Sequence, residues 1–370
     1  MKAVILVGGE GTRLRPLTSN RPKPMVPILN RPFLEHMVDY LKRHNVDDII
    51  LALCYLPDHI REYFGDGGAF GVKLTYVVED APLGTAGAVK NVEQYLDETF
   101  FVFNGDIFTD LDLTGMMKCH RETEATVTIA LTPVENPSIY GVVETSADGR
   151  VQRFIEKPSP DEVTTNMINA GTYIIEPHAL QRIPSNGFTM FESRVFPDLV
   201  GAGEAVYSHT SDAYWIDIGT PTKYVRLHHD LLNGKVEKSP SLSQWIWVDE
   251  DCEVHPQAEL EGPVVVGGNS VVGPGARIKG PTVIGSNCNI GEDSVVDGAI
   301  VWSNTTLGRG VSAKGCVIAE HVVLGDQSQV MEGSVLGDNV VVAPGETLAR
   351  DTRLGADGPS VRPMDALRRR

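Results

Sequence analysis

A glycine-rich segment with several cations stands near the start of the chain. GGEGTRLRPLT at residues 8–18 follows a short apolar run, and Arg13, Arg15 and Lys23 lie in it or just after it. Glycines let backbone N–H groups approach phosphate oxygens closely. The dinucleotide fingerprint needs glycine where Leu14 stands, and the P-loop needs glycine and lysine at Leu14 and Arg15. The segment therefore predicts an anion site of another kind, the alternative being a solvated turn with ordinary surface charges.

Two aspartates occupy positions suited to a divalent cation. Asp106 in NGDI directly follows the apolar run 100–103, which places it at the carboxyl edge of a predicted parallel sheet. Asp217 in YWIDIGTP has apolar neighbours and is expected to be partly buried and to need a partner. Hard oxygen ligands completed by substrate phosphates suit Mg²⁺ better than zinc. A turn or helix cap is the alternative for Asp106, and a structural role is the alternative for Asp217.

A third polar cluster, FIEKP, stands at residues 154–158. Glu156 suits sugar hydroxyls and Lys157 suits a phosphate, and both come at the end of a predicted strand. The alternative is an exposed edge at which the two side chains form a salt bridge.

These groups need a scaffold, and the first part of the chain predicts a sheet. Up to about Gly234, β-branched runs alternate with amphipathic helical stretches, a pattern typical of an α/β sheet with helices on both faces. Strands are predicted over residues 3–7, 49–53, 74–78, 100–103, 127–131, 151–155 and 172–175. One helix is predicted between Pro32 and His44. Another begins at Thr220, which a proline follows, and ends near Gly234.

The second part of the chain has a six-residue period. Aliphatic residues recur from Val266 at 272, 278, 284, 290 and 296, slip once near Val301, and continue at 318, 324, 330, 336, 342, 348 and 354. This period fits neither a helix nor a two-faced strand, but it suits a coiled ribbon whose flat sides are hexads. It predicts a parallel β-helix and resembles the left-handed hexapeptide β-helix. A β-sandwich is the alternative.

The predicted organisation is a first domain over 1–234, a connector over 235–250, the β-helix over 251–354 and a flexible tail over 355–370. Because a solenoid exposes flat sheet faces, we expect a homo-oligomer that assembles through the β-helix.

Composition limits the classes of partner. The chain has 370 residues, with 32 Lys and Arg against 49 Asp and Glu, which gives a net charge of −17. This charge disfavours nucleic acid and anionic membrane surfaces. No apolar run reaches the length of a membrane span. Five separated cysteines without CxxC spacing favour a reducing, cytoplasmic location.

Together these motifs carry a resemblance to a known family. GGxGTRLxPLT, RPKP, PLGTAGA, NGD, YGVV, EKP, NAGTY and WxDIGTP, in this order, resemble the sugar-1-phosphate nucleotidyltransferase family. The resemblance implies a Rossmann-like mixed-sheet nucleotidyltransferase domain, here followed by the left-handed β-helix. It also implies attack by a sugar 1-phosphate oxygen on the α-phosphorus of a nucleoside triphosphate, which yields a nucleotide sugar and pyrophosphate. PLGTAG, INAGTYI, FESRVFP and WIDIGTP are most similar to the branch that uses GTP and mannose 1-phosphate.

The resemblance also implies roles for individual residues. Arg13, Lys23, Asp106 and Asp217 would be catalytic, and the two aspartates would carry Mg²⁺. The nucleotide would be bound by Leu6, Gly8, Gly9, Gly11, Thr12, Arg13, Lys23, Glu79, Pro82, Gly84 and Thr85. The sugar phosphate would be bound by Asn104, Gly141, Glu156, Lys157, Asn169 and Gly171.

Glu79 favours guanine among the bases. By resemblance it lies in the segment that reads the base, and an ionised carboxylate only accepts hydrogen bonds. Guanine offers a ring N–H and an amine side by side, whereas uracil and thymine flank one N–H with carbonyl oxygens. The alternative is that Glu79 points to solvent or caps the helix that starts near Thr85.

Three other functions remain open. The first is the same reaction with glucose 1-phosphate and UTP, dTTP or ATP. The second is a non-catalytic sensor of nucleotide sugars, which the presence of all the candidate cations and aspartates disfavours. The third is an acyltransferase β-helix, for which His255 and His321 are candidates without a recognisable acyl-carrier context.

Overall fold

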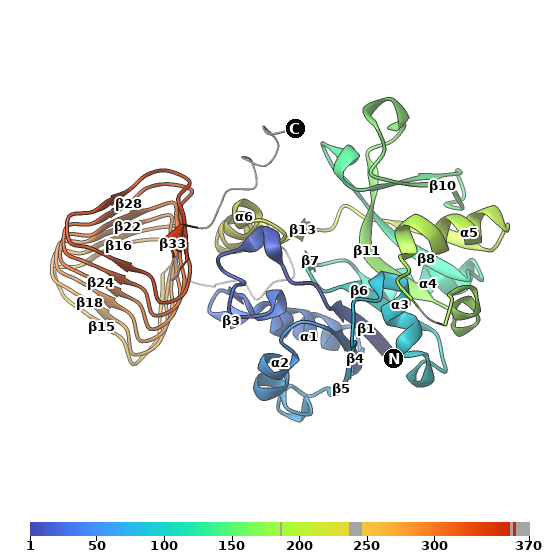
Figure 1. Ribbon diagram of the computed structural model, residues 1–370, viewed down its shortest axis with the longest axis horizontal. Coiled ribbons are helices and arrows are strands. Elements are labelled where there is room, and N and C mark those ends of the chain that lie inside the picture. The colour runs from blue at the N-terminus through green and yellow to red at the C-terminus, as the bar shows by residue number, and fades with distance from the viewer. Residues whose placement is uncertain (186, 237–245, 356–357, 360–370) are drawn as a thin grey trace. The chain divides into compact units, whose positions relative to one another are not determined.

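The computed structural model describes residues 1–185, 187–236, 246–355 and 358–359. Contacts divide the chain into two compact units. The first is Met1–Gly9 with Leu34–Asp217, and the second is Glu10–Phe33 with Ile218–Arg370 (Figure 1). Most of the predicted connector and nearly all of the predicted tail lie outside the described residues.

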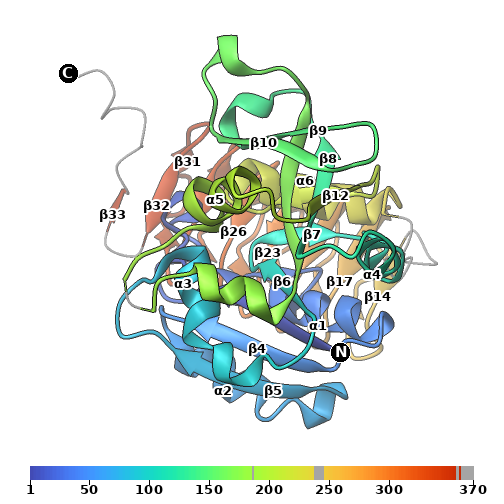
Figure 2. The same ribbon diagram turned by 90° about the vertical axis from the view of Figure 1, so that its right-hand side faces the viewer.

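A nine-stranded mixed sheet forms the centre of the first unit, as predicted. Its main path runs β10-β9-β11-β6-β1-β4-β5, and β8 joins β11 to β12. Strands β6, β1, β4 and β5 are parallel and lie side by side, while β11 is antiparallel to β6 (Figure 2). The strands are β1 Lys2–Val7, β4 Asp48–Leu53, β5 Lys73–Val78, β6 Phe100–Asn104, β8 Val127–Pro133, β9 Gly141–Thr145, β10 Val151–Glu156, β11 Met167–Ile175 and β12 Val206–Thr210.

Both faces of the parallel part of the sheet are covered. Successive side chains of a strand point to opposite faces, and Ala3, Val4 and Ile5 of β1 are all 0% exposed. The helices are α1 Phe33–Arg43, α2 Pro57–Phe64, α3 Gly84–Asn91, α4 Leu113–Glu122 and α5 Phe196–Gly201, with a π-helical turn at Phe191–Val195. Val4 packs in one core with Val89 of α3 and with Phe191. A two-stranded ribbon, β7 Ile107–Thr109 with β13 Trp215–Asp217, completes the unit.

A β-helix of three sheets, whose strands are parallel except for β33, fills most of the second unit. Each coil contributes one short strand to each sheet, and aliphatic residues at the hexad positions form a single buried core. Left-handed backbone at the corners is carried by residues that tolerate it, such as Asn269, Asn287 and Asn304. The strands are β14 Ile246–Val248, β15 Glu253–Val254, β16 Glu259–Glu261, β17 Val264–Val266, β18 Val271–Val272, β19 Arg277–Lys279, β20 Thr282–Ile284, β21 Asn289–Ile290, β22 Val295–Asp297, β23 Ile300–Val301, β24 Thr306–Leu307, β25 Ser312–Lys314, β26 Val317–Ile318, β27 Val323–Leu324, β28 Gln329–Val330, β29 Val335–Leu336, β30 Val341–Val342, β31 Thr347–Leu348, β32 Arg353–Gly355 and β33 Gly358–Pro359.

The six-residue period shortens twice, not once as predicted. Ile284 pairs with Val301 and Val301 pairs with Ile318, so the inward positions after Val296 are 301, 307, 313 and 318. One corner therefore lacks a residue in each of two successive coils. Ala313 occupies an inward position of this stretch and is fully buried, but it is too small to stand out in an aliphatic pattern.

The second unit also contains the segment 10–33, called here the signature segment, and the helix α6 Pro221–Leu232. The signature segment contains the short 3-10 turns Thr12–Leu14 and Lys23–Met25, and the paired strands β2 Pro27–Ile28 and β3 Arg31–Pro32. Helix α6 begins directly after Thr220, as the sequence predicted, and the Thr220 side chain accepts a hydrogen bond from the backbone N–H of Lys223. Among the helices that the structure describes, none has the length and apolar character needed to cross a bilayer.

Candidate functional site

Polar residues gather in the first unit where its parallel strands end. Val7, Leu53 and Val78 pair as the last residues of β1, β4 and β5, so Gly8 and Glu79 both follow directly at this carboxyl edge. A Cβ atom placed on Gly8 would lie 3.9 Å from Glu79 Oε1. The start of the glycine-rich segment therefore adjoins the carboxylate that the sequence assigned to the base.

Glu79 is buried rather than directed at solvent. It is 7% exposed, and its Oε2 accepts a hydrogen bond of 2.9 Å from the backbone N–H of Leu83. Burial raises the pKa of this carboxyl, and the hydrogen bond from Leu83 opposes the rise. Leu83 directly precedes α3, so this hydrogen bond connects Glu79 to the start of that helix. The same bond fixes the orientation of the carboxylate, whose Oε1 lies beside Gly8.

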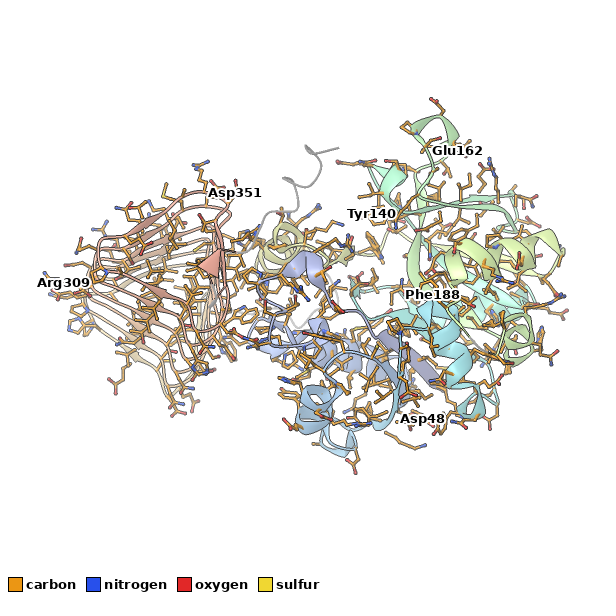
Figure 3. All side chains as sticks on the ribbon, in the orientation of Figure 1. Asp48, Tyr140, Glu162, Phe188, Arg309 and Asp351 are labelled. Atoms are coloured by element: carbon orange, nitrogen blue, oxygen red, sulfur yellow. The ribbon has the colours of Figure 1, made fainter. Side chains whose placement is uncertain are left out.

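The β7–β13 ribbon brings the backbone segments of the two aspartates predicted to bind metal side by side. Asp217 pairs with Ile107, the residue that follows Asp106. Asp217 is 7% exposed, and its Oδ2 accepts a hydrogen bond of 2.9 Å from the hydroxyl of Tyr140. The Tyr140 ring, labelled in Figure 3, meets the Trp215 ring edge-on at 5.4 Å between centroids.

These two carboxylates fit a hard divalent cation whose remaining ligands come from substrate. Across the part of the chain that the structure describes, no three His, Cys, Asp or Glu side chains cluster as a metal site. A closed structural metal centre of that kind is therefore missing from the described residues. Two carboxylates leave coordination positions for phosphate oxygens, which is how Mg²⁺ is commonly bound in phosphoryl-transfer sites.

Asn104 and Gly171 form the next part of the predicted sugar subsite. Gly171 has φ +71°, and a Cβ there would lie 2.8 Å from Asn104 Nδ2, so only glycine fits. The side-chain oxygen of Asn104 is buried and has no hydrogen-bond partner within the described residues. A buried acceptor without a partner is costly, and a ligand hydroxyl would satisfy it.

Glu156 and Lys157 lie where β10 ends. Gly141 pairs with Glu156, and a Cβ on Gly141 would stand 2.9 Å from Glu156 Oε2. The Lys157 ammonium lies 3.4 Å from Glu156 Oε1, so the salt bridge considered as the alternative is present. The Lys157 backbone has φ +49°, a conformation that is rare for residues other than glycine. Despite the salt bridge, the Lys157 side chain is 69% exposed. The cation is therefore still accessible to an anionic ligand.

A buried hydrogen-bonded chain connects the sugar and base segments. Asn169 Nδ2 donates to the hydroxyl of Tyr173 at 2.8 Å, and this hydroxyl donates to Glu192 Oε1 at 3.2 Å. Glu192 Oε2 accepts from the hydroxyl of Thr85 at 2.7 Å. The Thr85 oxygen in turn accepts from the backbone N–H of Phe191 at 2.9 Å. Thr85 and Asn169, predicted for two different ligands, are thus linked through one carboxylate.

Glu192, Tyr173, Tyr140 and Trp215 were not among the residues singled out from the sequence. Glu192 is 8% exposed, and burial raises the pKa of its carboxyl against the hydrogen bond from Thr85. A glutamate in an amphipathic stretch gives no sign of such burial. The sequence signal nearest to it was the FESRVFP segment, which was used only as part of the resemblance.

The other predicted nucleotide residues divide between the units. Leu6 and Gly9 belong to the first unit, together with exposed Pro82 and with Gly84. Gly84 has φ +76°, and a Cβ on it would lie 2.6 Å from the Thr189 carbonyl oxygen, so glycine is required.

Gly11, Thr12, Arg13 and Lys23 belong to the second unit. Gly11 has φ +63°, and a Cβ there would lie 3.2 Å from the Cβ of Lys23. Lys23 is 8% exposed, whereas Arg13 is exposed, as is Arg15, which pairs with Glu10 at 3.3 Å.

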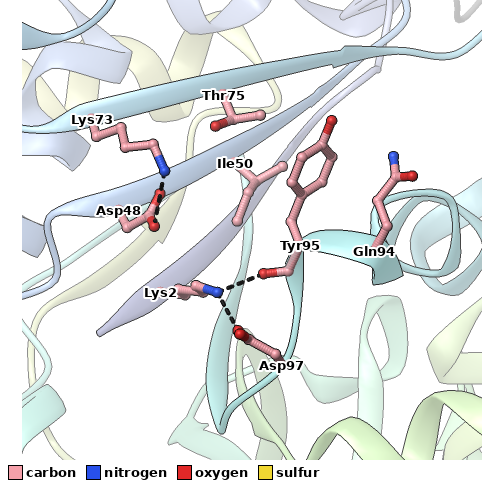
Figure 4. Close-up of a pocket in the computed structure, with 8 residues that line it drawn as sticks. All are labelled: Lys2, Asp48, Ile50, Lys73, Thr75, Gln94, Tyr95 and Asp97. Carbon is pink, nitrogen blue, oxygen red and sulfur yellow. Dashed lines mark hydrogen bonds and ion pairs between the residues drawn. The ribbon is translucent and has the colours of Figure 1, made fainter.

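A cavity of about 200 Å³ lies at the opposite edge of the sheet. It is lined at the amino ends of the strands by Lys2, Asp48 and Lys73, together with Asp97 (Figure 4). Lys2 pairs with Asp97, and Lys73 pairs with Asp48. None of the predicted site residues lines this cavity.

Comparisons with known proteins agree with the fold of both parts. Residues 2–234 match the family model described as nucleotidyl transferase. Residues 243–348 match the model of the EIF2B subunit epsilon LbH domain, which confirms the predicted left-handed β-helix.

Individual relatives fall in more than one branch. The chain is 40% identical to a mannose-1-phosphate guanylyltransferase of Mycobacterium tuberculosis, over 73% of this chain and 76% of the relative. It is 36% identical to a UTP–glucose-1-phosphate uridylyltransferase of Synechocystis, over 84% and 85%. Among solved structures, HddC of Yersinia pseudotuberculosis complexed with GMP-PN is similar with a TM-score of 0.53 and 32% identity, over 61% of this chain and 97% of that one.

Proposed function

Because the chain belongs to the nucleotidyl transferase family, we propose that it transfers a guanylyl group from GTP to mannose 1-phosphate and releases pyrophosphate. Family membership confirms the resemblance that the ordered motifs carried, and with it an enzyme that joins a nucleotide to a sugar 1-phosphate. The choice of this substrate pair needs an argument from the residues, since relatives of the guanylyl and uridylyl branches have similar identities to the chain.

The observation that carries the choice of base is the placement of Glu79. Its carboxylate is buried, and Oε1 faces the first glycine of the glycine-rich segment. A carboxylate only accepts hydrogen bonds, and guanine presents two adjacent donors. Uracil and thymine would bring carbonyl oxygens against the same charge, so the site favours GTP over UTP and dTTP.

The charged residues supply what the reaction needs. Two anions must meet and pyrophosphate must leave, so catalysis depends on positioning and on neutralising charge. Asp106 and Asp217 would hold Mg²⁺, which when bound neutralises negative charge on the phosphates. Lys23 would bind the α-phosphate, Arg13 the departing phosphates and Lys157 the sugar phosphate.

The sugar subsite offers both hydrogen-bond donors and acceptors. The side-chain oxygen of Asn169 accepts the N–H of Gly171 at 3.0 Å, and one amide hydrogen goes to Tyr173. Its second amide hydrogen is then available to a sugar hydroxyl oxygen. Asn104 Oδ1 and the Glu156 carboxylate accept hydrogen bonds from hydroxyl groups. This alternation suits a polyhydroxylated ring, and mannose 1-phosphate is the proposed acceptor.

A substrate matrix tests the proposal. Pyrophosphate release is measured for GTP, UTP, dTTP, ATP and CTP, each with mannose 1-phosphate and with glucose 1-phosphate. The largest kcat/KM is expected for GTP with mannose 1-phosphate. A larger value for UTP with glucose 1-phosphate would overturn the substrate pair and favour the uridylyl branch. No turnover with any pair would favour the sensor instead.

The proposal extends to assembly. The outward residues of one β-helix sheet, β15 to β30, include Val271, Val323 and Val341, with exposures of 40%, 42% and 72%. Exposed aliphatic side chains on flat strands are suited to contact with another subunit. We therefore infer a homo-oligomer in which the β-helix makes the subunit contacts.

A further inference from the structure

Arg21, a largely shielded residue of the signature segment, contacts side chains of the β-helix. Arg21 Nη2 lies 2.7 Å from Glu320 Oε2 and 3.3 Å from Asp338 Oδ2. Its guanidinium carbon also lies 4.6 Å from the centre of the Trp302 ring. The Arg21 side chain is only 16% exposed, so both ion pairs are partly shielded from water.

The three partners of Arg21 come from three successive coils. Trp302, Glu320 and Asp338 follow β23, β26 and β29, which are neighbouring strands of one sheet. The backbone N–H of Glu320 donates to Asp338 Oδ1 at 3.1 Å, which holds the Asp338 side chain beside the backbone of the preceding coil. A planar guanidinium can bond two carboxylates and stack on an aromatic ring together, which a lysine ammonium cannot do.

Further contacts hold the signature segment beyond Lys23. The Tyr224 hydroxyl donates to the carbonyl oxygen of Pro27 at 2.5 Å and accepts from Trp302 Nε1 at 2.9 Å. Asn30 Nδ2 donates to the carbonyl oxygen of Ile284 at 2.9 Å. Lys23 is therefore flanked on both sides by residues bonded to the coils or to α6.

We propose that Arg21 is a positioning residue whose contacts with Trp302, Glu320 and Asp338 fix the path of the signature segment and so hold Arg13 and Lys23 in the conformation that binds nucleotide phosphates. The β-helix would then support catalysis, by positioning the signature segment, in addition to making subunit contacts. The inference rests on the proposed function for the roles of Arg13 and Lys23, but the anchoring can be measured without any reaction.

Kinetics of full-length variants test the effect on turnover. Arg21→Ala is expected to lower kcat/KM for GTP by about ten- to a hundredfold, because small misplacement of binding groups costs rates of that order. The KM for sugar 1-phosphate is expected to stay within about twofold of the wild-type value, a split that general destabilisation would not produce. Arg21→Lys should recover only part of the loss, since one ammonium replaces one of several contacts.

Arg309→Ala is the matched control. This substitution also removes one arginine charge, but Arg309 lies on the β-helix and makes an exposed ion pair with Glu292 at 3.7 Å. Exposed pairs of this kind contribute little, so its kinetics should equal those of the wild type. Equal effects of Arg21→Ala and Arg309→Ala would overturn the inference.

A mutant cycle tests whether Arg21 acts through its two carboxylates. Glu320→Gln with Asp338→Asn should lower kcat/KM for GTP to a similar extent as Arg21→Ala. Adding Arg21→Ala to that pair should cause little further loss, because residues that act as a unit are not additive. If the losses in kcat/KM multiply in the combined variant, Arg21 acts through residues other than Glu320 and Asp338. If Arg21→Ala does not fold, the carboxylate variants and Arg21→Lys carry the same test.

Hydrogen exchange separates this inference from the proposed function. In Arg21→Ala, backbone amides of residues 10–33 should exchange at least about tenfold faster, while strands β17 to β26 keep their protection. Unchanged exchange in 10–33 would overturn the anchoring, whatever the enzyme's substrates are. Faster exchange in a protein whose wild type has no turnover would overturn the proposed function alone.

Discussion

Glu79 combines two roles in one side chain. Its Oε2 accepts the N–H that precedes α3, and its Oε1 faces Gly8 at the carboxyl edge of the sheet. The alternative that it caps the helix and the proposal that it reads the base are therefore compatible. Because the Leu83 N–H holds Oε2, the carboxylate keeps one orientation, in which Oε1 can accept hydrogen bonds from a base.

Glu79→Gln is predicted to shift base preference from GTP toward UTP or dTTP. The amide presents a donor where guanine also has donors, and hydrogen bonds to a charged group contribute about 1.5–3 kcal/mol. The ratio of kcat/KM for GTP to that for UTP should fall by about ten- to a hundredfold. Pyrophosphate release with each nucleotide measures it, and Glu122→Gln in an exposed helical pair is the control. An unchanged ratio would remove the argument for guanine.

Asp106→Asn is predicted to nearly abolish turnover and to leave the fold intact. The amide carries no negative charge toward Mg²⁺, and metal stabilisation of several kcal/mol corresponds to about two to three orders of magnitude in rate. Saturating-Mg²⁺ kinetics and circular dichroism measure the two effects. Asp148→Asn, in a turn where Asp148 accepts from Ser146, is the matched control. Near-normal turnover would contradict the metal role of Asp106.

The raised pKa of Glu192 makes stability depend on pH. Burial raises the folded-state pKa of this carboxyl, so the folded protein binds more protons than the unfolded chain between the two pKa values. The free energy of unfolding therefore falls as pH rises through that window, which begins near the ordinary pKa of glutamate. Glu192→Gln is predicted to remove this component, so the unfolding free energy of the variant should gain on the wild type as pH rises. Urea unfolding at several pH values measures the difference, and a constant difference would contradict the prediction.

At the scale of elements, β11 and α3 are joined through the Tyr173 hydroxyl and Glu192. Tyr173→Phe deletes this hydroxyl with little change of shape. We expect a loss of about 1–3 kcal/mol in unfolding free energy, because buried partners remain unpaired. The KM for sugar 1-phosphate should rise severalfold, because Asn169 loses one of the two hydrogen bonds that orient its amide. Tyr76→Phe removes a hydroxyl bond to Gly65 in a more exposed place and is the control. An unchanged KM would show that Asn169 does not depend on Tyr173.

The elements themselves follow closely from local sequence patterns. The strand predicted over 49–53 and the helix predicted to begin at Thr220 are both present in the structure. Such elements can be predicted because burial and capping depend on only a few neighbouring residues. The second shortening of the hexad period was not predicted. Its inward residue is Ala313, which lacks the bulk that marks the other positions.

The contacts among distant residues were harder to predict. Asp217 was expected to be buried, but Tyr140 as its partner is set by tertiary structure 77 residues away in sequence. Arg21 was not singled out from the sequence, because its partners are 299 and 317 residues further along the chain. Residue type alone does not show such pairings.

At the scale of the whole molecule, the predicted homo-oligomer can be tested directly. Light scattering at micromolar concentration should give a mass that is a multiple of 40.2 kDa. The net charge of −17 opposes self-association, so added salt should favour the oligomer by screening. A mass of one chain at all salt concentrations would contradict the assembly proposal.

The anchoring of Arg21 has a consequence during synthesis. Asp338 leaves the ribosome 317 residues after the arginine that it contacts. Domains generally begin to fold from the N-terminus as the chain is made, but this contact must wait until the coils that carry Glu320 and Asp338 have been made. A product that terminates before Glu320 would leave the guanidinium without either carboxylate, so the signature segment would lack both of these ion pairs. Synthesis of the coils that carry Glu320 and Asp338 is therefore a condition for the signature segment to make its full set of contacts.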